Sequence, residues 1–384
     1  MSTWIHSIET VVPDNFYTQE FAREFMKTHV GKGGAAARML HRIYSMSGIE
    51  KRHCVIKEFN EENGSGIFFD HQTQAFLNPG TGARNDLYTE EARNLYIKLA
   101  GKCVDSSGFS KEDITHVITV SCTGFFAPGP DYYVVRALGL PPATRRYHIG
   151  FMGCYAAFPA IKLAETICAE NPDAVVLIAC VELCTIHLQF STATDAMISA
   201  SVFADGGAGA VISKKVPNGK KAVLEIDQLK TTLTDEGEQD MAWTIGDHGF
   251  DMILSTYVPD IIQANLVDLL TPLLSGKYKK EDFAYWAVHP GGRAILDKVQ
   301  QSMELDDALL APSRNTLKNF GNMSSATVLF VLKEILESNP NKISPIISMA
   351  FGPGLTVETG IFNLIPAKLA DTTEHIQEEH ATVS

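Results

Sequence analysis

Three polar side chains lie in similar settings along this sequence and could together form a nucleophilic catalytic site. Cys154, His289 and Asn322 each lie in a glycine-containing loop that leads into an expected helix. Cys154 follows an apolar strand and Gly153 in the segment IGFMGCYAAF, and small residues come after it. The positive end of a helix dipole favours the thiolate form of such a cysteine, which is the nucleophile. The alternative is a buried cysteine that acts only as a small hydrophobic residue.

The two other positions carry an imidazole and an amide, which can exchange a proton and donate hydrogen bonds. His289 ends an expected strand before a Pro-Gly-Gly turn, and we expect its ring to face a cleft. Asn322 lies between Gly321 and a helix start, and the segment FGPG (351–354) suits a tight turn against a ligand or an oxyanion. A core or capping histidine and a simple cap or turn asparagine are the alternatives. Cysteine hydrolases also use Cys, His and Asn, but a cysteine near the mature N-terminus is typical of them.

The elements that must position these residues alternate between buried strands and helices, which favours an α/β fold. We expect a helical region over 20–47 with an interruption at 31–38, a surface loop over 56–85, and an amphipathic helix that ends near Gly108. The stretch 251–274 is predicted to be one long helical region.

The order of elements is similar in the two parts of the chain, which hints at a duplicated unit. A charged, turn-rich segment, KKVPNGKK, separates them. We therefore predict an N-terminal half over 1–215, a C-terminal half over 222–366 and a flexible tail over 367–384.

Composition narrows the class of protein. The chain has 384 residues and a formal net charge of -13, which argues against general nucleic-acid binding. No stretch of about 18 apolar residues predicts a membrane span, and the N-terminus lacks the features of a signal peptide. Seven cysteines without a CxxC pair indicate free thiols in a reducing cytoplasm, and no spacing resembles a metal site.

Four motifs together resemble the type III polyketide synthases, the chalcone synthase-like enzymes: GFMGCYAAF, WAVHPGGRAILD, FGNMSSATVLFVL and AFGPGLTVETGIF. They occur in the family's order over roughly residues 5–365. The resemblance implies a thiolase-like fold with duplicated αβαβα layers, pseudo-twofold symmetry and a homodimer. It also implies loading of an acyl-CoA starter, decarboxylative condensation with malonyl-CoA and cyclisation, with coenzyme A thioesters as substrates and no further cofactor.

Related condensing enzymes are the nearest alternatives. A biosynthetic thiolase needs a second catalytic cysteine late in the chain, and no cysteine follows Cys184. Hydroxymethylglutaryl-CoA synthases use a glutamate base and lack the FGPG ending. Ketoacyl synthases that use an acyl carrier protein share Cys-His-Asn and remain the closest competitor.

The resemblance implies roles for individual residues. Cys154, His289 and Asn322 correspond to the catalytic triad. Contacts to coenzyme A correspond to Arg42, Arg293 and Ala294. Contacts to the acyl substrate correspond to Phe203, Met252, Cys122, Thr123, Cys184, His187, Trp243, Ser324, Gly352, Pro353 and Gly354.

Several of these positions depart from the plant enzymes. Met252 replaces a gatekeeping aromatic residue, Cys184 and His187 replace threonines, Trp243 replaces a small glycine, and Met46 replaces a lysine. A hydrogen-bonded interior residue is the alternative for His187. The replacements predict an altered cavity that takes an aliphatic acyl starter and yields an alkylpyrone or alkylresorcinol.

Overall fold

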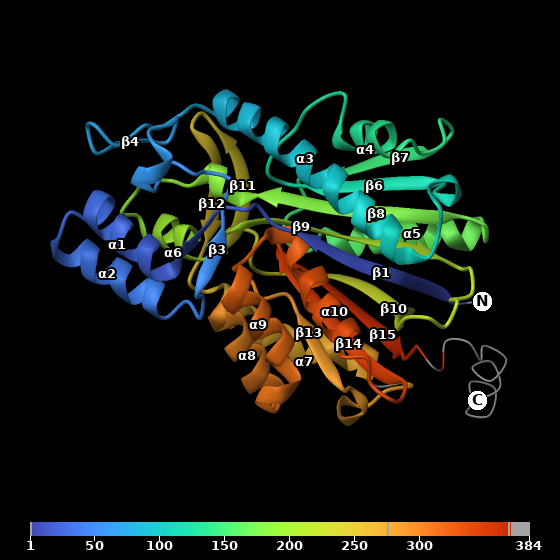
Figure 1. The fold of residues 1–384 in the computed structure, drawn as a ribbon. Coiled ribbons are helices and arrows are strands. Elements are labelled where there is room, and N and C mark those ends of the chain that lie inside the picture. The colour runs from blue at the N-terminus through green and yellow to red at the C-terminus, as the bar shows by residue number, and fades with distance from the viewer. Residues whose placement is uncertain (1, 275, 368, 370–384) are drawn as a thin grey trace.

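A computed structural model describes residues 2–274, 276–367 and 369 of the chain (Figure 1). The helices are α1 Gln19–Met26, α2 Gly34–Ser45, α3 Thr81–Ser107, α4 Pro130–Leu138, α5 Ala157–Glu170, α6 Thr194–Val202, α7 Val258–Leu274, α8 Arg293–Met303, α9 Ala311–Phe320 and α10 Thr327–Glu337. The strands are β1 Thr3–Val11, β2 Phe16–Thr18, β3 Lys51–His53, β4 Phe69–Asp70, β5 Ala75–Phe76, β6 His116–Ser121, β7 Arg145–Gly150, β8 Val175–Leu183, β9 Asp205–Ser213, β10 Val223–Leu233, β11 Met241–Gly246, β12 Gly249–Leu254, β13 Tyr285–Val288, β14 Ser344–Gly352 and β15 Thr356–Ile365.

The main sheet repeats one pattern of strand pairing. Its order is β13-β14-β15-β10-β1-β9-β8-β6-β7. In the N-terminal part, β6 is parallel to β8, β8 is antiparallel to β9, and β9 is antiparallel to β1. In the C-terminal part, β13, β14, β15 and β10 repeat these three pairings in the same order. The two sets meet where β1 pairs antiparallel with β10, which makes the duplication visible in the topology.

Alternate side chains of the strands enter different hydrophobic cores. In β6, Ile118 packs with α5 and α10, whereas Val117 packs against α3 on the other face. In β13, Ala287 joins the same central core, whereas Trp286 packs with α7 and α8. Strands buried on both faces need apolar or small side chains: β8 is a nearly continuous apolar run, and β9 consists mainly of glycine, alanine and aliphatic residues. The two halves of the sheet enclose α5 and α10 between them, with α3 outside one half and α7 and α8 outside the other. The layers are therefore helix, sheet, helix, sheet, helix, as predicted.

The N-terminal helical region differs in detail from the sequence prediction. The interruption is confined to residues 32–33, where Lys32 and Gly33 have φ of 40° and 87°. The alanines after Gly34 belong to α2, because alanine has the highest helix propensity. The helix α3 ends at Ser107 with Gly108 in the left-handed conformation, as expected, but it begins at Thr81 inside the predicted loop.

The prediction of one helical region over 251–274 is wrong for its first residues. Residues up to Leu254 belong to β12, and α7 begins at Val258. β12 pairs with β11 in a hairpin in which Met252 lies opposite Trp243. The hydrogen bonds to β11 make these residues a strand, although their apolar pattern also fits a helix. The hairpin stands apart from the main sheet and places both side chains at the candidate site.

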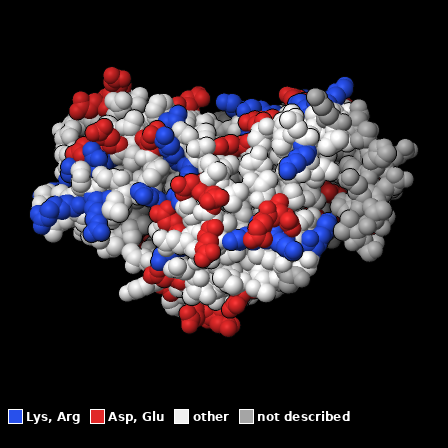
Figure 2. All heavy atoms as spheres, turned by 90° about the horizontal axis from the view of Figure 1, so that it is seen from below, with Lys and Arg blue, Asp and Glu red and all other residues white. Residues whose placement is uncertain are grey.

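Charged side chains are mixed on the surface. Figure 2 shows acidic and basic groups interspersed on the face seen from below, with basic groups gathered at the end where Figure 1 places α1 and α2. Among the helices that the structure describes, none is long and apolar enough to cross a membrane. The predicted tail, 367–384, lies outside the described residues except for Ala367 and Leu369.

Candidate active site

The loop that carries Cys154 joins β7 to α5. Gly153 has φ of 85°, which favours glycine, and α5 begins three residues after the cysteine. A Cβ added at Gly153 would lie 2.6 Å from Cδ of Pro353. One added at Gly352 would lie 2.4 Å from the ring of Tyr155. The FGPG segment therefore packs directly on the cysteine loop, and its small residues permit that approach.

His289 follows the last residue of β13. Its backbone N–H donates to the carbonyl of Met349 at 2.8 Å, which continues the pairing of β13 with β14. The residue is 1% exposed, so its ring is shielded from solvent, and it lines the small cavity described below. Both ring nitrogens are buried without a hydrogen-bond partner among the described residues. A buried unpaired imidazole is costly in a structural role, which favours a role in binding or catalysis.

Asn322 lies between α9 and a short 3-10 helix, η7 (Ser324–Ala326), and its amide is held in one orientation. Its Oδ1 accepts from the backbone N–H of Ser324 at 2.9 Å, and its Nδ2 donates to the carbonyl of Gly291 at 3.2 Å. The first bond closes a local turn, as expected if Asn322 were only a cap or turn residue. The second directs the donor side of the amide toward the loop that follows His289.

These side chains from distant parts of the sequence meet at one small cavity of about 40 Å³. Cys154, His289 and Asn322 all line it. Predicted substrate contacts also line it, namely Cys122, Phe203, Trp243, Met252, Ser324 and Pro353. We refer to it as the catalytic cavity.

Burial controls the protonation of the two titratable groups. Burial raises the pKa of the Cys154 thiol to about 11, although hydrogen bonds from Ser324 and Asn322 act in the opposite direction. Burial lowers the pKa of His289 to about 3. Desolvation of the empty site thus acts against the thiolate that a helix N-terminus favours, and it also favours the neutral imidazole.

Behind the catalytic cavity lies a buried carboxylate that sequence reasoning missed. Glu182 is fully buried and accepts from the Cys122 backbone N–H at 2.9 Å, from Thr123 Oγ1 at 2.8 Å and from Ser325 Oγ at 2.5 Å. Burial raises its pKa above the usual range. Thr123 thus faces Glu182 and does not line the catalytic cavity. A single acidic residue within the apolar run AVVLIACVEL was the available signal.

His187 and Trp243 fix the β11–β12 hairpin to the wall of the site. His187 Nε2 donates to the Thr123 carbonyl at 2.7 Å, and its Nδ1 accepts from the Phe250 N–H at 3.0 Å, which sets the tautomer. Burial lowers the pKa of His187 to about 3. Trp243 Nε1 donates to the Cys122 carbonyl at 2.8 Å. The alternative interpretation of His187 as a hydrogen-bonded interior residue is confirmed.

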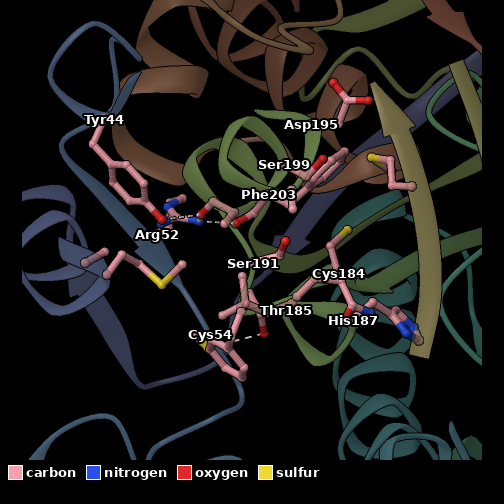
Figure 3. A pocket seen from close by; sticks show the side chains of 18 of the residues that line it. Tyr44, Arg52, Cys54, Cys184, Thr185, His187, Ser191, Asp195, Ser199 and Phe203 are labelled. Atoms are coloured by element: carbon pink, nitrogen blue, oxygen red, sulfur yellow. Dashed lines mark hydrogen bonds between the residues drawn. The ribbon is translucent and has the colours of Figure 1, made fainter. Parts of the chain in front are cut away.

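A second and larger cavity of about 380 Å³ adjoins the first. It lies among α1, α2, α6 and the short helix η4 (Cys184–His187), and Figure 3 shows part of its lining. Cys184 and His187 line it, and Phe203, Trp243 and Met252 line both cavities. The aromatic residues that α1 contributes were not predicted as part of any site.

The predicted coenzyme A contacts line neither cavity. Arg42 is exposed in the last turn of α2, and Arg293 and Ala294 are exposed at the start of α8. A Cβ added at Gly48, just after α2, would lie 3.6 Å from the Arg293 side chain, so the two helices approach each other here. Ile295 from the same turn of α8 lines the catalytic cavity. The predicted contacts therefore lie on the surface outside it.

Comparison with known sequences decides the family. The description "Chalcone and stilbene synthases, N-terminal domain" matches residues 2–216, and the corresponding C-terminal domain matches residues 225–366. The chain belongs to the chalcone and stilbene synthase family. It is a type III polyketide synthase, and hence an acyltransferase with a thiolase-like fold.

Solved structures agree with this assignment. The crystal structure of PKS-I from the brown alga Ectocarpus siliculosus is similar with a TM-score of 0.88 and 28% identity, covering 95% of this chain and 98% of that one. The C-terminal type III polyketide synthase domain of Steely1, a type I/III hybrid from Dictyostelium, has a TM-score of 0.85 and 24% identity, covering 95% and 100%. At that lower identity the likeness shows the fold alone.

Proposed function

We propose that this polyketide synthase loads an acyl group from acyl-CoA onto Cys154 and extends it with malonyl-CoA by decarboxylative Claisen condensation. The observation that carries this proposal is the convergence of Cys154, His289 and Asn322 on one buried cavity. Neither ring nitrogen of His289 has a hydrogen-bond partner among the described residues, which leaves the ring available to accept the Cys154 proton when substrate binds.

In the loading step, the Cys154 sulfur attacks the thioester carbonyl of the starter while its proton passes to the imidazole of His289. The carbon–sulfur bond to coenzyme A breaks, and the leaving thiolate takes that proton. The products are an acyl-enzyme and free coenzyme A, and His289 is neutral again.

In the extension step, the thioester carbonyl of malonyl-CoA accepts hydrogen bonds from His289 and Asn322. The bond to the carboxylate breaks, carbon dioxide leaves, and the electron pair forms an enolate whose oxygen these donors stabilise. One such donor typically contributes about 3–4 kcal/mol. The enolate carbon then attacks the Cys154 thioester, its carbon–sulfur bond breaks, and the sulfur leaves as a thiolate that takes a proton from water; the product is an extended ketoacyl-CoA. The orientation of Asn322, fixed by Ser324 and Gly291, supports its part as a donor.

The proposal extends to substrate and product. The starter is an aliphatic acyl-CoA, because Trp243 and Met252 leave little room beside Cys154 for a planar aromatic group. The product is an alkylpyrone or an alkylresorcinol. Arg42, Arg293 and Ala294 would contact coenzyme A at the surface outside the catalytic cavity. A homodimer and a cytoplasmic location belong to the same proposal, and light scattering tests the first.

The test uses a Cys154→Ala enzyme with an acyl-CoA panel and malonyl-CoA, followed by mass analysis of the products. We expect loss of condensation with malonyl-CoA decarboxylation retained, because His289 and Asn322 remain. Cys168→Ala is the matched control. Cys168 lies within α5, the helix that follows Cys154, but it bonds only to backbone carbonyls in the central core. Continued condensation by Cys154→Ala would refute the proposal.

Two further outcomes would reassign the activity. If only acyl groups on a carrier protein load Cys154, the enzyme is a carrier-dependent ketoacyl synthase. If the acyl-enzyme yields only free acid in the presence of malonyl-CoA, it is a hydrolase.

A further inference from the structure

Cys154 is the most accessible of the seven cysteines, all of which are free thiols in this structure. The other six are buried. Some of these have fixed partners: Cys54 donates to Thr185 Oγ1 at 3.2 Å (Figure 3), and Cys168 bonds to backbone carbonyls in the central core. An oxidant that enters the molecule therefore meets the nucleophile first.

Cys122 shares its surroundings with Cys154. Both residues line the catalytic cavity. The hydroxyl group of Ser324 contacts both, because Cys122 Sγ lies 3.2 Å from Ser324 Oγ and Ser324 also hydrogen-bonds to the Cys154 thiol. Cys184, by contrast, lines the second cavity and not this one. One hydroxyl group thus separates the nucleophile from a second thiol.

The backbone brings this pair together at adjoining strand ends. Cys122 directly follows β6, and β6 and β7 are parallel neighbours. In the loop that leads from β7 to Cys154, Phe151 and Gly153 have φ of 60° and 85°. These left-handed residues turn the loop tightly, so Cys154 stays close to the end of β6.

Ser324 is held in a backbone conformation that residues with a side chain rarely adopt. Its φ is 46°, and its backbone N–H donates to Asn322 Oδ1 at 2.9 Å. Such conformations persist where the surrounding structure fixes them, and they are concentrated at functional sites. The hydroxyl is therefore fixed beside both sulfur atoms and separates them while both are reduced.

The protonation of the two thiols sets the order in which they react. Burial and the charge of Glu182 raise the pKa of Cys122 well above its usual range. Burial raises the pKa of Cys154 less far, to about 11, and His289 lines the same cavity with both ring nitrogens free to take its proton. Because the thiolate is the form that peroxides oxidise, Cys154 reacts first, and Cys122 remains to attack the product.

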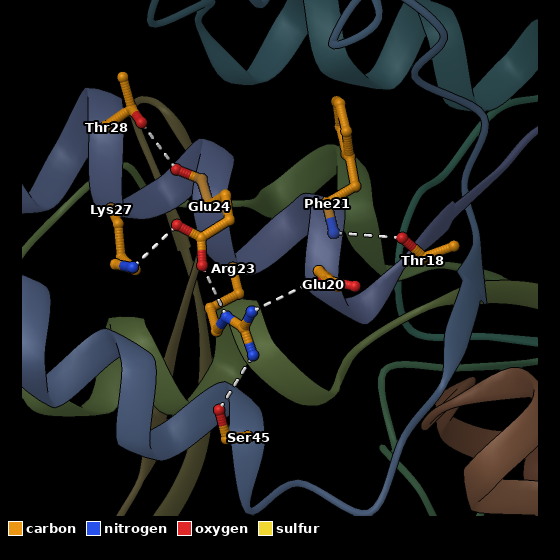
Figure 4. Close-up of polar contacts among 8 residues, drawn as sticks. All are labelled: Thr18, Glu20, Phe21, Arg23, Glu24, Lys27, Thr28 and Ser45. Carbon is orange, nitrogen blue, oxygen red and sulfur yellow. Dashed lines mark hydrogen bonds and ion pairs between the residues drawn. The ribbon is translucent and has the colours of Figure 1, made fainter.

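Only a slender oxidant fits this site. The catalytic cavity of about 40 Å³ holds about three water-sized groups, at about 10–15 Å³ each. The helices beside the second cavity are fixed to one another, because Thr18 caps α1 by accepting from the Phe21 N–H at 3.1 Å and Arg23 Nη1 donates to Ser45 Oγ of α2 at 3.2 Å (Figure 4). Hydrogen peroxide is smaller than the catalytic cavity, whereas glutathione disulfide is far larger.

We propose that Cys122 is a resolving cysteine, which converts the oxidation of Cys154 by a hydroperoxide into a reversible Cys122–Cys154 disulfide. The inference rests on the proposed function, because it treats Cys154 as the residue whose blockage stops condensation. It adds a redox modification site to the catalytic cavity and assigns Cys122 a chemical role of its own.

Two steps form the disulfide. The Cys154 sulfur attacks one oxygen of hydrogen peroxide, the oxygen–oxygen bond breaks, and the leaving hydroxide takes the thiol proton through His289. Sulfur is oxidised to a sulfenic acid, and the peroxide is reduced to water. The Cys122 sulfur then attacks the Cys154 sulfur, the sulfur–oxygen bond breaks, and hydroxide leaves as water with the Cys122 proton. A dithiol reductant restores both thiols by exchange.

Peptide mapping of the wild-type enzyme detects the disulfide without any substrate. The enzyme is treated with equimolar hydrogen peroxide, free thiols are alkylated, and tryptic peptides are analysed without reduction. Cleavage isolates Cys122 in residues 112–136 and Cys154 in residues 147–162. We expect these two peptides to be cross-linked. A cross-link from Cys154 to the peptide that contains Cys184, or a Cys154 sulfinic acid without any cross-link, would overturn the inference.

Recovery of activity tests the protective role of Cys122. Each enzyme is treated with excess peroxide and then with dithiothreitol, and its condensation is compared with that of the same enzyme before treatment. We expect dithiothreitol to restore most of the wild-type activity and at least a fivefold smaller fraction in Cys122→Ser, because its sulfenic acid proceeds to the irreversible sulfinic acid. Cys184→Ser is the matched control and should recover as the wild type does.

Equal recovery of Cys122→Ser and the wild type would overturn the inference. If Cys122→Ser condenses too poorly for this comparison, the mass of its Cys154 peptide after peroxide and dithiothreitol gives the same answer. A sulfinic acid is expected there, and a thiol would count against the proposal. The cross-link itself is read in the wild-type chain and does not depend on the folding of any variant.

The inference and the proposed function can fail separately. Absence of the cross-link in an enzyme that condenses normally would overturn the inference alone. A fully cross-linked enzyme that still condenses would refute Cys154 as the nucleophile, and with it the proposed function, while the two cysteines would stand as a redox pair.

Discussion

Glu182 offers a sharp test of how the buried wall of the site is held, because one carboxylate accepts several hydrogen bonds there. If Glu182→Ala removes this acceptor, the hydroxyl groups of Ser121 and Thr123 can still bond to each other, since their oxygens lie 3.2 Å apart. The backbone N–H of Cys122 cannot turn away and is left buried without a partner. That orphan costs about 1–3 kcal/mol, and the deleted side chain leaves a void that adds about 1–2 kcal/mol.

Glu182→Gln is the matched variant, because its amide oxygen can still accept from the Cys122 N–H and its NH₂ group can donate to Ser325 Oγ. We expect Glu182→Ala to lower the free energy of unfolding by about 2–5 kcal/mol and Glu182→Gln to lower it by about 1 kcal/mol or less. Urea unfolding followed by circular dichroism measures both. Equal stabilities of the two variants would refute this explanation of the wall.

The pH dependence of stability gives a second readout of the same residue. The folded-state pKa of Glu182 is raised above its usual value of 4.5, so the folded protein binds this proton more tightly than the unfolded chain. Its contribution is present below pH 4.5 and is lost as the pH rises through the folded-state pKa. Glu182→Gln should lack this loss of stability. If the difference in unfolding free energy between the wild-type enzyme and Glu182→Gln stayed constant with pH, the raised pKa of Glu182 would be contradicted.

Other parts of the site make separate predictions. Trp243→Phe removes the bond to the Cys122 carbonyl, so the free energy of unfolding should fall by about 1–2 kcal/mol in urea unfolding, and an unchanged value would show that this bond is not needed. His289 should stay neutral from pH 8 to pH 5 because burial places its pKa at about 3, and NMR titration of its ring should show no midpoint in that range. Gly352→Ala places a Cβ against the ring of Tyr155, so kcat should fall at least tenfold; a normal kcat would show that the loop yields at no cost.

The sequence predicted those parts of the structure that depend on local pattern. Alternating apolar strands and helices indicated the layers, and Gly108 marked the end of α3 because a left-handed residue there favours glycine. The residues up to Leu254 were predicted to be helical because the hairpin signal was missed: β11 and β12 are joined by the two-residue turn Asp247–His248, which Gly246 and Gly249 flank. A helix end favours a thiolate at Cys154, but the burial that opposes this effect is a property of the packed molecule.

The candidate site likewise contains residues that the sequence predicted and features that it could not predict. Cys154, His289 and Asn322 were found from their loops and from the family resemblance, and the structure brings them to one cavity. Thr123 was expected to line that cavity and instead bonds to Glu182, which is a question of side-chain direction within a buried strand end. The second cavity depends on α1 and α6 meeting in space, and no spacing of residues along the chain expresses that contact.

Peptide mass spectrometry of the enzyme quenched with acid after mixing with dodecanoyl-CoA tests the central claim most directly. The proposed mechanism predicts an acyl thioester on the peptide that contains Cys154, which disappears when malonyl-CoA is added and an extended product forms. Acylation of another cysteine, or a Cys154 thioester that malonyl-CoA leaves unchanged in the active enzyme, would contradict it.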